Sequence, residues 1–538
     1  MSLPLRMEAA VATANELSIN NSASAMNMAQ EIFGDGVTVT GASYSGDWRS
    51  SGTYSGGDTT TAGVTPSDSG VILSTGRTSS FTNSHGGSNT NMNSNTSRNT
   101  YGVNNDSDFN ALAGTNTYDA SFLEIDFVPD AGVEYISMQF VFSSEEYPEY
   151  TNSIYNDAVG IWINGQEVEM AIGDSSVGNV NATDNSNLYV NNTGDQYNTE
   201  MDGFTVTMSV KIPVTAGVVN SIKIGIADVA DSSYDSNLLI AGDSIQSAVL
   251  AFDDTTNLYP DGSKTIDVLA NDTTSSTGVL TITHINGIAV TAGDSVTLST
   301  GQTVQLNADG TLTLVGDGDT ENVSFTYKVE DSVTGETDTA FVTVDSIPCF
   351  VAGTLVDTPD GPRPVEGLEP GDLVLTKDNG AQPLRWIGRR AVEARGNFAP
   401  IRIRENTFGT HGEVMVSPLH RVLIRDALAE LLFGEREVLV AAKDLVNDRS
   451  VRRIEGGDVD YVHLLFDRHQ VVFTHGLASE SFLPGPQTTK SFEQEIVEEI
   501  CAIFPEIDPT TGEGYSPAAR RTLKGYEARL LVASREAA

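Results

Sequence analysis

The sequence predicts a mainly β protein of several domains. Short runs that alternate apolar and polar residues recur through residues 1–346 and are typical of antiparallel strands. Dipeptides such as DG, ND, NG and TG separate these runs and mark turns. A chain of 538 residues is also too long for a single hydrophobic core. We therefore expect domains at 1–246, 247–346 and 349–485, followed by a tail at 486–538.

The charge of the chain is acidic and unevenly distributed. The formal net charge is −43 at pH 7. Residues 1–348 contain 8 basic and 44 acidic residues, a net charge of −36, whereas residues 349–538 contain 22 and 29, a net charge of −7. The front part therefore repels nucleic acid, which we exclude as a partner, and its carboxylates suit hard cations such as Ca²⁺.

The first domain is expected to be a jelly-roll-like sandwich. Its strand-like runs include VTVTGASY, GVILSTG, SFLEIDFVP, YISMQFVFS, AVGIWING, FTVTMSVKIPV and SIKIGIAD. Two other stretches, FVFSSEEYPEYTNSIYND and IADVADSSYDSNLLI, resemble the choice-of-anchor L domain of bacterial surface and secreted proteins. The resemblance implies an extracellular or cell-surface location but names no ligand. A surface glycan or a protein is the partner class that we expect.

The route to that location is expected to involve neither a membrane span nor an N-terminal signal peptide. No apolar run reaches 18 residues, which predicts no membrane-spanning helix. The N-terminal stretch MSLPLRMEAAVATANELSINN lacks the continuous apolar core of a signal peptide. Two cysteines 152 positions apart also do not form a disulfide framework.

Acidic side chains in residues 1–346 are candidate Ca²⁺ ligands, because Ca²⁺ takes six to eight oxygen atoms. The candidates lie in two groups: Glu145, Glu146, Glu149 and Asp157; and Asp253, Asp254 and Asp272. Their spacing matches neither an EF-hand nor a glycine–aspartate repeat. The other interpretation is that they are turn residues and charges that block edge pairing of strands.

The middle domain is expected to be a β-sandwich of about a hundred residues. The pieces IDVLANDT and LNADGTLT resemble the cadherin-like or Ig-like repeats of bacterial adhesins. The repeat occurs once, so we expect a stiff spacer between the first and third domains.

The third domain begins at Cys349, the first of the two cysteines. CFVAGTLVDTPDGPRPVEGLEPGDLVLT resembles the opening block of the Hint fold, which inteins and hedgehog autoprocessing domains share. VSPLHRVLI resembles the second block, usually T-x-x-H, and YVHLLFDRHQVVFTHGLASESFLPG resembles the closing block. WIGRR and LLFGEREVLV point to a bacterial subgroup of this fold. The resemblance implies an all-β horseshoe that places its first residue beside its closing strands.

The resemblance implies self-cleavage at the Pro348–Cys349 bond by an N-to-S acyl shift. The Cys349 thiol attacks the carbonyl of Pro348, an intramolecular step for which effective molarities of order 10⁵–10⁸ M are known. The product is a thioester and a free amine, and no cofactor is required. A thiol titrates near ~8.5 and needs activation. Pro348 fixes its own φ, which either presets or crowds the carbonyl.

The other candidate site residues have roles by analogy with the family. His420 is the expected general acid that protonates the departing nitrogen. Ser417 takes the place of the usual threonine and holds the scissile peptide. Asp467 and His469 form a D-x-H, and on a strand both face the same side, toward Cys349. The alternative is that the imidazole and the carboxylate are ordinary structural groups.

Five further residues complete the prediction. His463 and His475 lie near the D-x-H and are expected to be structural, and Cys501 is expected to pack in an apolar helical stripe.

Inteins end in His-Asn, and this chain has Glu480 and Ser481 at the corresponding place. Splicing is therefore not expected, and the thioester passes to water or to an unidentified nucleophile. The competing interpretation is a non-cleaving adhesin or matrix protein with a degenerate Hint domain.

The tail from 486 to 538 is expected to be helical. Two stretches, SFEQEIVEEICAIFPEI and SPAARRTLKGYEARLLVASREAA, have helical patterns. Ser516 and Pro517 have the residue types of a helix cap and a first helical position, so they are expected to open the second helix.

Overall fold

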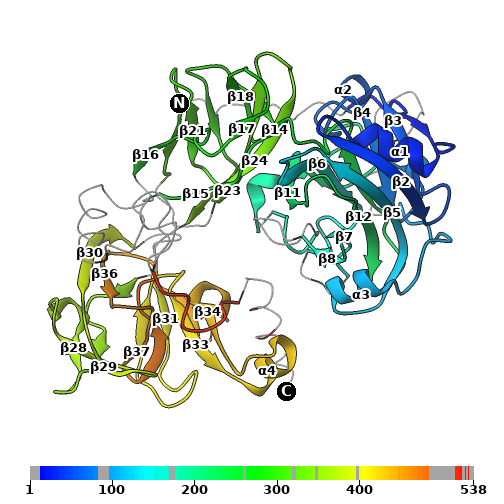
Figure 1. Ribbon diagram of the computed structural model, residues 1–538. Helices are drawn as coiled ribbons and strands as arrows, with labels where there is room; N and C mark the ends of the chain where they lie inside the picture. The colour runs from blue at the N-terminus through cyan, green and yellow to red at the C-terminus, as the bar shows by residue number, and fades with distance from the viewer. Residues whose placement is uncertain are drawn as a thin grey trace, which may run out of the picture. The chain divides into compact units, whose positions relative to one another are not determined.

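The computed structural model is mostly β and divides into two compact units, which are described separately (Figure 1). The first unit comprises Met1–Asp254, Thr265–Thr313 and Val323–Val342, and the second comprises Thr255–Lys264, Leu314–Asn322 and Thr343–Ala538. The structure describes residues 12–82, 96–151, 153, 155–168, 176–182, 184–258, 262–317, 323–345, 349–394, 399–447, 449–483, 504, 515–523, 528 and 531. No helix in these ranges is long and apolar enough to cross a membrane.

The first 250 residues form two large antiparallel sheets. One has eight strands: β1 (Ser18–Asn20), β3 (Ser51–Ser55), β4 (Ser69–Ser74), β13 (Ser236–Ala241), β6 (Tyr135–Ser144), β10 (Gly203–Thr205) and β9 (Tyr189–Asn191) in that order, with β11 (Met208–Pro213) paired to β6. The other has the order β2 (Val37–Ser45), β5 (Thr117–Pro129), β12 (Asn220–Val229), β7 (Ala158–Ile163) and β8 (Gln166–Glu167). The helical turns are α1 (Ala25–Ile32), η1 (Thr78–Ser80), α2 (Gly57–Thr60), α3 (Ser107–Ala113) and η2 (Ser186–Leu188).

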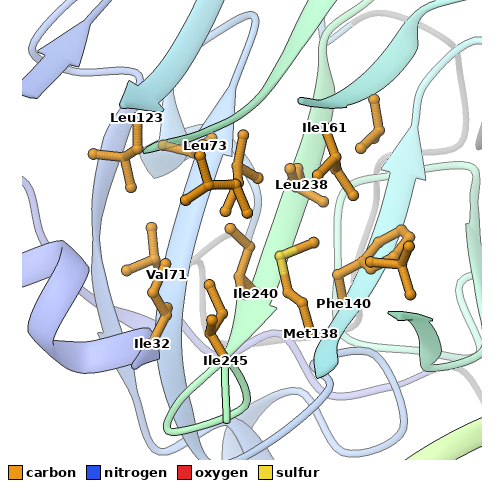
Figure 2. Packing of buried hydrophobic residues seen from close by; sticks show 14 of the residues in the cluster. Ile32, Val71, Leu73, Leu123, Met138, Phe140, Ile161, Leu238, Ile240 and Ile245 are labelled. Atoms are coloured by element: carbon orange, nitrogen blue, oxygen red, sulfur yellow. The ribbon is translucent and has the colours of Figure 1, made fainter. Parts of the chain in front are cut away.

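Alternation along the strands explains how these sheets share one core. In β5, Leu123 and Ile125 are buried, whereas Glu124 and Asp126 between and after them are exposed. Side chains from both sheets and from α1 enter the same apolar cluster, as Figure 2 shows for Ile32 of α1, Leu73 of β4, Leu123 of β5, Phe140 of β6 and Ile161 of β7. The helix α1 begins at a capping box, in which Ser24 and Asn27 satisfy each other's backbone amides.

The middle segment adds three smaller sheets. The pair β14 (Val249–Leu250) and β17 (Thr273–Thr274) is followed by a five-stranded sheet and a four-stranded sheet. The five-stranded order is β15 (Asp254–Asn257), β24 (Thr337–Asp345), β23 (Val323–Asp331), β18 (Leu280–Ile285) and β19 (Ile288–Ala289), and the four-stranded order is β16 (Ser263–Ile266), β22 (Leu312–Val315), β21 (Thr303–Leu306) and β20 (Ser295–Thr297).

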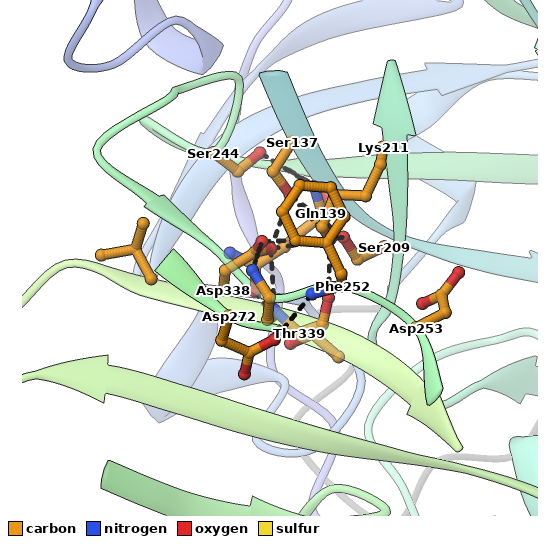
Figure 3. A network of polar contacts seen from close by, with 12 residues as sticks. Ser137, Gln139, Ser209, Lys211, Ser244, Phe252, Asp253, Asp272, Asp338 and Thr339 are labelled. Atoms are coloured by element: carbon orange, nitrogen blue, oxygen red, sulfur yellow. Dashed lines mark hydrogen bonds and ion pairs between the residues drawn. The ribbon is translucent and has the colours of Figure 1, made fainter. Parts of the chain in front are cut away.

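A buried polar network inside the first unit joins β6 and β11 to β24 (Figure 3). Lys211 Nζ lies 3.0 Å from Asp338 Oδ2, and the two side chains are 9% and 0% exposed. Ser137 Oγ donates to Asp338 Oδ1 at 2.5 Å, and Gln139 Nε2 donates to the Thr337 carbonyl at 3.0 Å. A buried charge is tolerated only when it is paired and hydrogen-bonded, so this network fixes how the β24 segment docks on the first sheet.

The second unit holds two sheets formed by residues 350–480. The six-stranded order is β30 (Trp386–Glu393), β36 (Asp458–Leu465), β25 (Phe350–Val351), β32 (Val414–Val416), β31 (Ile401–Ile403) and β35 (Val451–Arg453). The eight-stranded order is β27 (Arg363–Pro364), β26 (Leu355–Val356), β37 (Val471–Thr474), β38 (Leu477–Glu480), β33 (Arg421–Arg425) and β34 (Glu437–Ala441), with β28 (Leu373–Thr376) paired to β37 and to β29 (Gly380–Pro383). The helical turns are η3 (Val365–Gly367), α4 (Ala427–Phe433) and η5 (Ala442–Leu445).

The tail differs from the predicted helix over residues 515–523, whereas Ala528 and Leu531 are helical as predicted. Residues 515–521 and 523 have no regular secondary structure, and Thr522 forms a parallel bridge with Leu439 of β34. Ser516 does not cap a helix, because its hydroxyl accepts the backbone N–H of His469 at 2.7 Å. Over residues 515–523 the docking contacts with β34 and His469 replace the predicted helix. Cys501 and most of 486–514 lie outside the described residues.

Candidate functional site

Cys349 is held at the centre of the six-stranded sheet. The next residues form β25, which pairs with β32 on one side and with β36 on the other. The Cys349 side chain is only 7% exposed and belongs to an apolar cluster with Val351, Val459 and Tyr461. The thiol therefore lies in a dry setting, where contacts with neighbouring polar groups are strong. Pro348, which supplies the carbonyl of the expected scissile bond, lies outside the described residues.

Ser417 contacts the amide nitrogen of the expected scissile bond. The Cys349 N–H donates to Ser417 Oγ at 2.8 Å, and the Ser417 N–H donates to the Cys349 carbonyl at 2.9 Å. Both partners are buried. Ser417 thus holds the Cys349 backbone from both sides.

A tight turn places His420 next to Ser417. The His420 N–H donates to the Ser417 carbonyl at 3.1 Å, with Pro418 at the turn position that favours proline. The His420 ring is buried, and its centroid lies 4.3 Å from that of Phe350. Neither ring nitrogen has a hydrogen-bond partner among the described residues. Burial lowers the pKa of His420 to about 4, so the imidazole is neutral at pH 7.

His463 is a neighbour of the thiol that the sequence analysis treated as structural. Its Nε2 lies 3.5 Å from Cys349 Sγ. The register explains this contact, because Phe350 pairs with Val462 and Val351 with Tyr461, so Cys349 lies opposite His463. Paired residues on antiparallel strands point to the same side. The alternation in the stretch YVHLL, combined with this pairing, is the signal that identifies His463.

Trp386 and Phe482 hold the His463 ring in place. The Trp386 ring stacks on it with centroids 6.5 Å apart, and Phe482 meets it edge-on at 5.5 Å. His463 is 5% exposed. The aromatic contacts restrict the imidazole to the orientation that faces the sulfur.

Asp467 is not on a strand, contrary to the sequence-based expectation. The strand β36 ends at Leu465, and Asp467 lies in the bend before β37. Its carboxylate forms a bidentate pair with Arg385, with N–O distances of 2.7 and 2.8 Å, and is 47% exposed. The alternation rule applies only to extended strand, so it does not direct Asp467 toward Cys349.

His469 lies in the same connection and binds the tail and Glu480. Its Nδ1 accepts the Ala519 N–H at 2.9 Å, and its Nε2 lies 3.4 Å from Glu480 Oε2. Glu480 is fully buried, and its two oxygens contact the Arg421 N–H and Nη1 at 2.9 and 3.2 Å. Although burial opposes ionisation, Arg421 and His469 lower the pKa of Glu480. His475 accepts the Leu355 N–H at 3.0 Å, a structural contact as expected.

Comparisons with known families match two parts of the chain. Residues 348–486 match the Hint domain. Residues 15–246 match the Choice-of-anchor L domain. No curated protein matches the chain.

Three solved structures show limited similarity to the chain. The gp41-1 intein is 12% identical, covers 25% of this chain and 98% of its own, and has a TM-score of 0.17. The M60 catalytic domain with the CBM51 domains of Clostridium perfringens ZmpB is 12% identical, over 68% of this chain and 32% of its own, with a TM-score of 0.14. Extracellular domains 3–5 of Drosophila OTK are 11% identical, cover 65% of this chain and 92% of their own, and have a TM-score of 0.15. These TM-scores establish no common fold.

The Choice-of-anchor L region contains a group of buried carboxyl groups. Glu146, Asp157, Asp228 and Asp235 are at most 3% exposed. Burial, and for Glu146 also the neighbouring Asp157, raises the pKa of Glu146 to about 10, and burial raises the pKa of Asp157 and of Asp235 to about 7. In the described parts of the chain no three His, Cys, Asp or Glu side chains are arranged to hold a metal ion. Burial thus favours the protonated form of these carboxyl groups.

The acidic residues of the middle segment are satisfied by protein donors. Asp254 Oδ2 and Asp272 Oδ1 each lie 3.1 Å from the Tyr327 hydroxyl, and Asp253 Oδ1 accepts the Phe341 N–H at 2.9 Å. These contacts fit the interpretation of these residues as structural groups of turns and strand ends.

Proposed function

We propose that the Hint domain cleaves its own chain between Pro348 and Cys349 through an N-to-S acyl shift. The observation that carries the proposal is the hydrogen bond from the Cys349 N–H to Ser417 Oγ. This N–H is the amide hydrogen of the bond that would break. A hydroxyl at this atom fixes the peptide for attack and stays with the nitrogen as it becomes an amine.

The chemical step needs no co-reactant. Cys349 Sγ forms a bond to the Pro348 carbonyl carbon, the carbon–nitrogen bond breaks, and the thiol proton ends on the new amine of Cys349. His463 Nε2, 3.5 Å from Sγ, is the group positioned to accept the proton from the thiol. The result is a thioester between Pro348 and the Cys349 side chain.

His420 is the group that we assign to the departing nitrogen. It follows Ser417 by one tight turn, and its two ring nitrogens have no partner among the described residues. A buried polar group without a partner costs free energy, so a functional reason is expected for it. With a pKa of about 4 the ring is neutral at pH 7, so only its small protonated fraction donates to the departing nitrogen, and the proton released by the thiol restores the balance.

The fate of the thioester follows from the closing strand. Glu480 occupies the place where splicing domains carry asparagine, and it is fixed in a buried pair with Arg421 and His469. A carboxylate cannot cyclise as an asparagine amide does, so splicing is not proposed. Water or another nucleophile takes the thioester and releases or attaches residues 1–348. The Choice-of-anchor L match supports a surface-anchored or secreted role for that part.

A time course with two cysteine variants tests the proposal. The purified full chain is incubated at pH 7 with and without a small thiol and run on a denaturing gel. Wild type and Cys501→Ala should give two fragments that correspond to residues 1–348 and 349–538, faster with thiol. Cys349→Ala should remain intact. A full-length wild-type band under all conditions would favour the non-cleaving adhesin or matrix protein instead.

A further inference from the structure

One edge of the Choice-of-anchor L region combines exposed aromatic rings with arginines. Trp48 is 70% exposed and Tyr101 is 88% exposed, whereas the other two tryptophans, Trp162 and Trp386, are 7% and 5% exposed. The Arg49 guanidinium carbon lies 5.8 Å from the centroid of the Trp48 ring. Large exposed aromatic side chains that gather at one place mark binding surfaces.

Hydrogen bonds bring three chain segments together at this edge. The Tyr101 N–H donates to Asp47 Oδ2 at 3.1 Å, and Arg49 holds the same carboxylate through its Nη2 at 2.6 Å. The Thr78 N–H donates to the Arg49 carbonyl at 3.0 Å. Trp48 and Arg49, Arg77 beside Thr78, and Tyr101 therefore lie on neighbouring backbones.

Arg98 belongs to the same edge. Its N–H donates to Asp235 Oδ1 at 2.6 Å, and Gly76, the residue before Arg77, lies against that carboxylate. The Thr100 hydroxyl donates to the Thr75 carbonyl at 3.1 Å. We call the set Trp48, Arg49, Arg77, Arg98 and Tyr101 the aromatic–arginine patch.

The patch is basic in an otherwise acidic part of the chain. It holds three of the eight basic residues of 1–348, and residues 69–105 contain no aspartate or glutamate. Arg77 and Arg98 are exposed, and no ion pair between described residues includes either of them. The acidic groups beneath them are buried, and Asp47 is already neutralised by Arg49. Arg77 and Arg98 therefore add exposed positive charge beside two aromatic faces, whereas the charge of Arg49 is offset by Asp47.

We propose that the aromatic–arginine patch binds an acidic polysaccharide whose sugar rings carry carboxylates. Pyranose rings present C–H groups that pack on aromatic faces, and guanidinium groups bind carboxylates with two parallel hydrogen bonds. Nucleic acid would offer stacking and phosphates too. The double helix, with one charge per about 1.7 Å, is opposed most by the net charge of −43, and a uronate chain with one charge per ring is opposed less; a single strand is distinguished by the titration below.

The patch can be tested by the fluorescence of Trp48, the single exposed tryptophan. The full-length Cys349→Ala chain, which stays in one piece, is titrated with an oligogalacturonate, with its methyl ester and with oligothymidylate. Binding of the oligogalacturonate should protect Trp48 from acrylamide quenching and should weaken as salt rises. The methyl ester keeps the rings without the charge and should bind at least about tenfold more weakly.

Variants then assign the binding to the patch. Trp48→Ala and the pair Arg77→Ala with Arg98→Ala should each lower the affinity at least about tenfold, measured by calorimetry. Tyr155→Ala and Arg452→Ala remove an exposed ring and an exposed cation elsewhere and should leave it unchanged. Circular dichroism melting confirms that each variant is folded. No binding of the oligogalacturonate, equal binding of its methyl ester, tighter binding of oligothymidylate, or unchanged affinity in the patch variants would each overturn the proposal.

Discussion

At the scale of single residues, the site depends on how the Cys349 backbone and sulfur are contacted. A tight turn after β32 fixes Ser417 and His420, and Ser417 contacts the Cys349 backbone. The sequence predicts Asp467 near Cys349 and a structural role for His463, and the structure has the two the other way round. His463 lies 3.5 Å from the sulfur and Asp467 is paired with Arg385 at the surface. A motif predicts residue types, but strand register decides which side chain faces the nucleophile.

Ser417 substitutions test the contact with the scissile amide. Ser417→Ala should slow cleavage about tenfold, because a buried amide N–H loses its acceptor. Ser417→Thr keeps the hydroxyl and adds a methyl group that restricts χ1, so it should cleave at least as fast as wild type. Densitometry of gel time courses gives both rates. A slow Ser417→Thr variant together with an unaffected Ser417→Ala variant would contradict this role.

His463 and Asp467 can be compared directly. His463→Ala should lower the cleavage rate at least about 100-fold, the contribution expected of a positioned base. Asp467→Asn removes only a half-exposed ion pair and should change the rate by less than about twofold. The same time courses measure both variants. A large loss in Asp467→Asn with no loss in His463→Ala would restore the roles expected from the sequence.

At the scale of elements, alternation predicted the strands well where one face is buried, as in β5. It failed in the connection between β36 and β37, which carries Asp467 and His469, because polar residues at period two also occur in bends. The helix prediction for residues 515–523 of the tail failed for another reason. Helix propensity is a weak preference, and the docking of residues 515–523 on β34 and His469 supplies tertiary hydrogen bonds that outweigh it.

The strand ends of the first domain bury carboxyl groups, which makes stability depend on pH. The folded pKa of Asp157 and of Asp235 is about 7, above the unfolded value of ~3.9. The stabilisation linked to these protons is complete below about pH 4 and is lost as pH rises through 7. The free energy of unfolding should thus fall from pH 5 to pH 8, by up to about 1.4 kcal/mol per pH unit for each group.

Urea unfolding at several pH values, followed by tryptophan fluorescence, measures this slope. Asp157→Asn should flatten this slope, whereas Asp130→Asn, at an exposed carboxylate of the same domain, should not.

Melting with added Ca²⁺ at pH 8 tests the remaining calcium prediction. A melting point that Ca²⁺ raises in wild type, and does not raise in Asp157→Asn, would show that these carboxylates bind the cation in place of protons.

At the scale of the whole molecule, the sequence predicted a mainly β chain and the two family matches. It did not predict that the middle segment docks on the first sheet through the Lys211–Asp338 pair, because the partners are 127 positions apart and each looks like an ordinary strand residue. Such pairs carry no local pattern. They become visible only when both strands are placed.

Lys211→Met tests that pair. It leaves Asp338 buried without its cation and should lower the free energy of unfolding by about 3 kcal/mol or more. Arg436→Ala removes an ion pair in which both side chains are about 60% exposed, so it should change the free energy of unfolding by less than about 0.5 kcal/mol. Chemical denaturation of the full-length Cys349→Ala chain provides the comparison. Equal effects of the two substitutions would contradict the structural role of the network.

The most direct test of self-cleavage is the intact mass of the N-terminal product formed in hydroxylamine. Hydroxylamine reacts with thioesters much faster than with peptide bonds, so it records which bond carried the acyl group. We predict a fragment of residues 1–348 with a hydroxamate at Pro348, and a free acid at Pro348 when only water is present. A Pro348–Cys349 bond that stays whole in hydroxylamine, or a fragment of residues 1–348 without the hydroxamate, would contradict the thioester at Cys349.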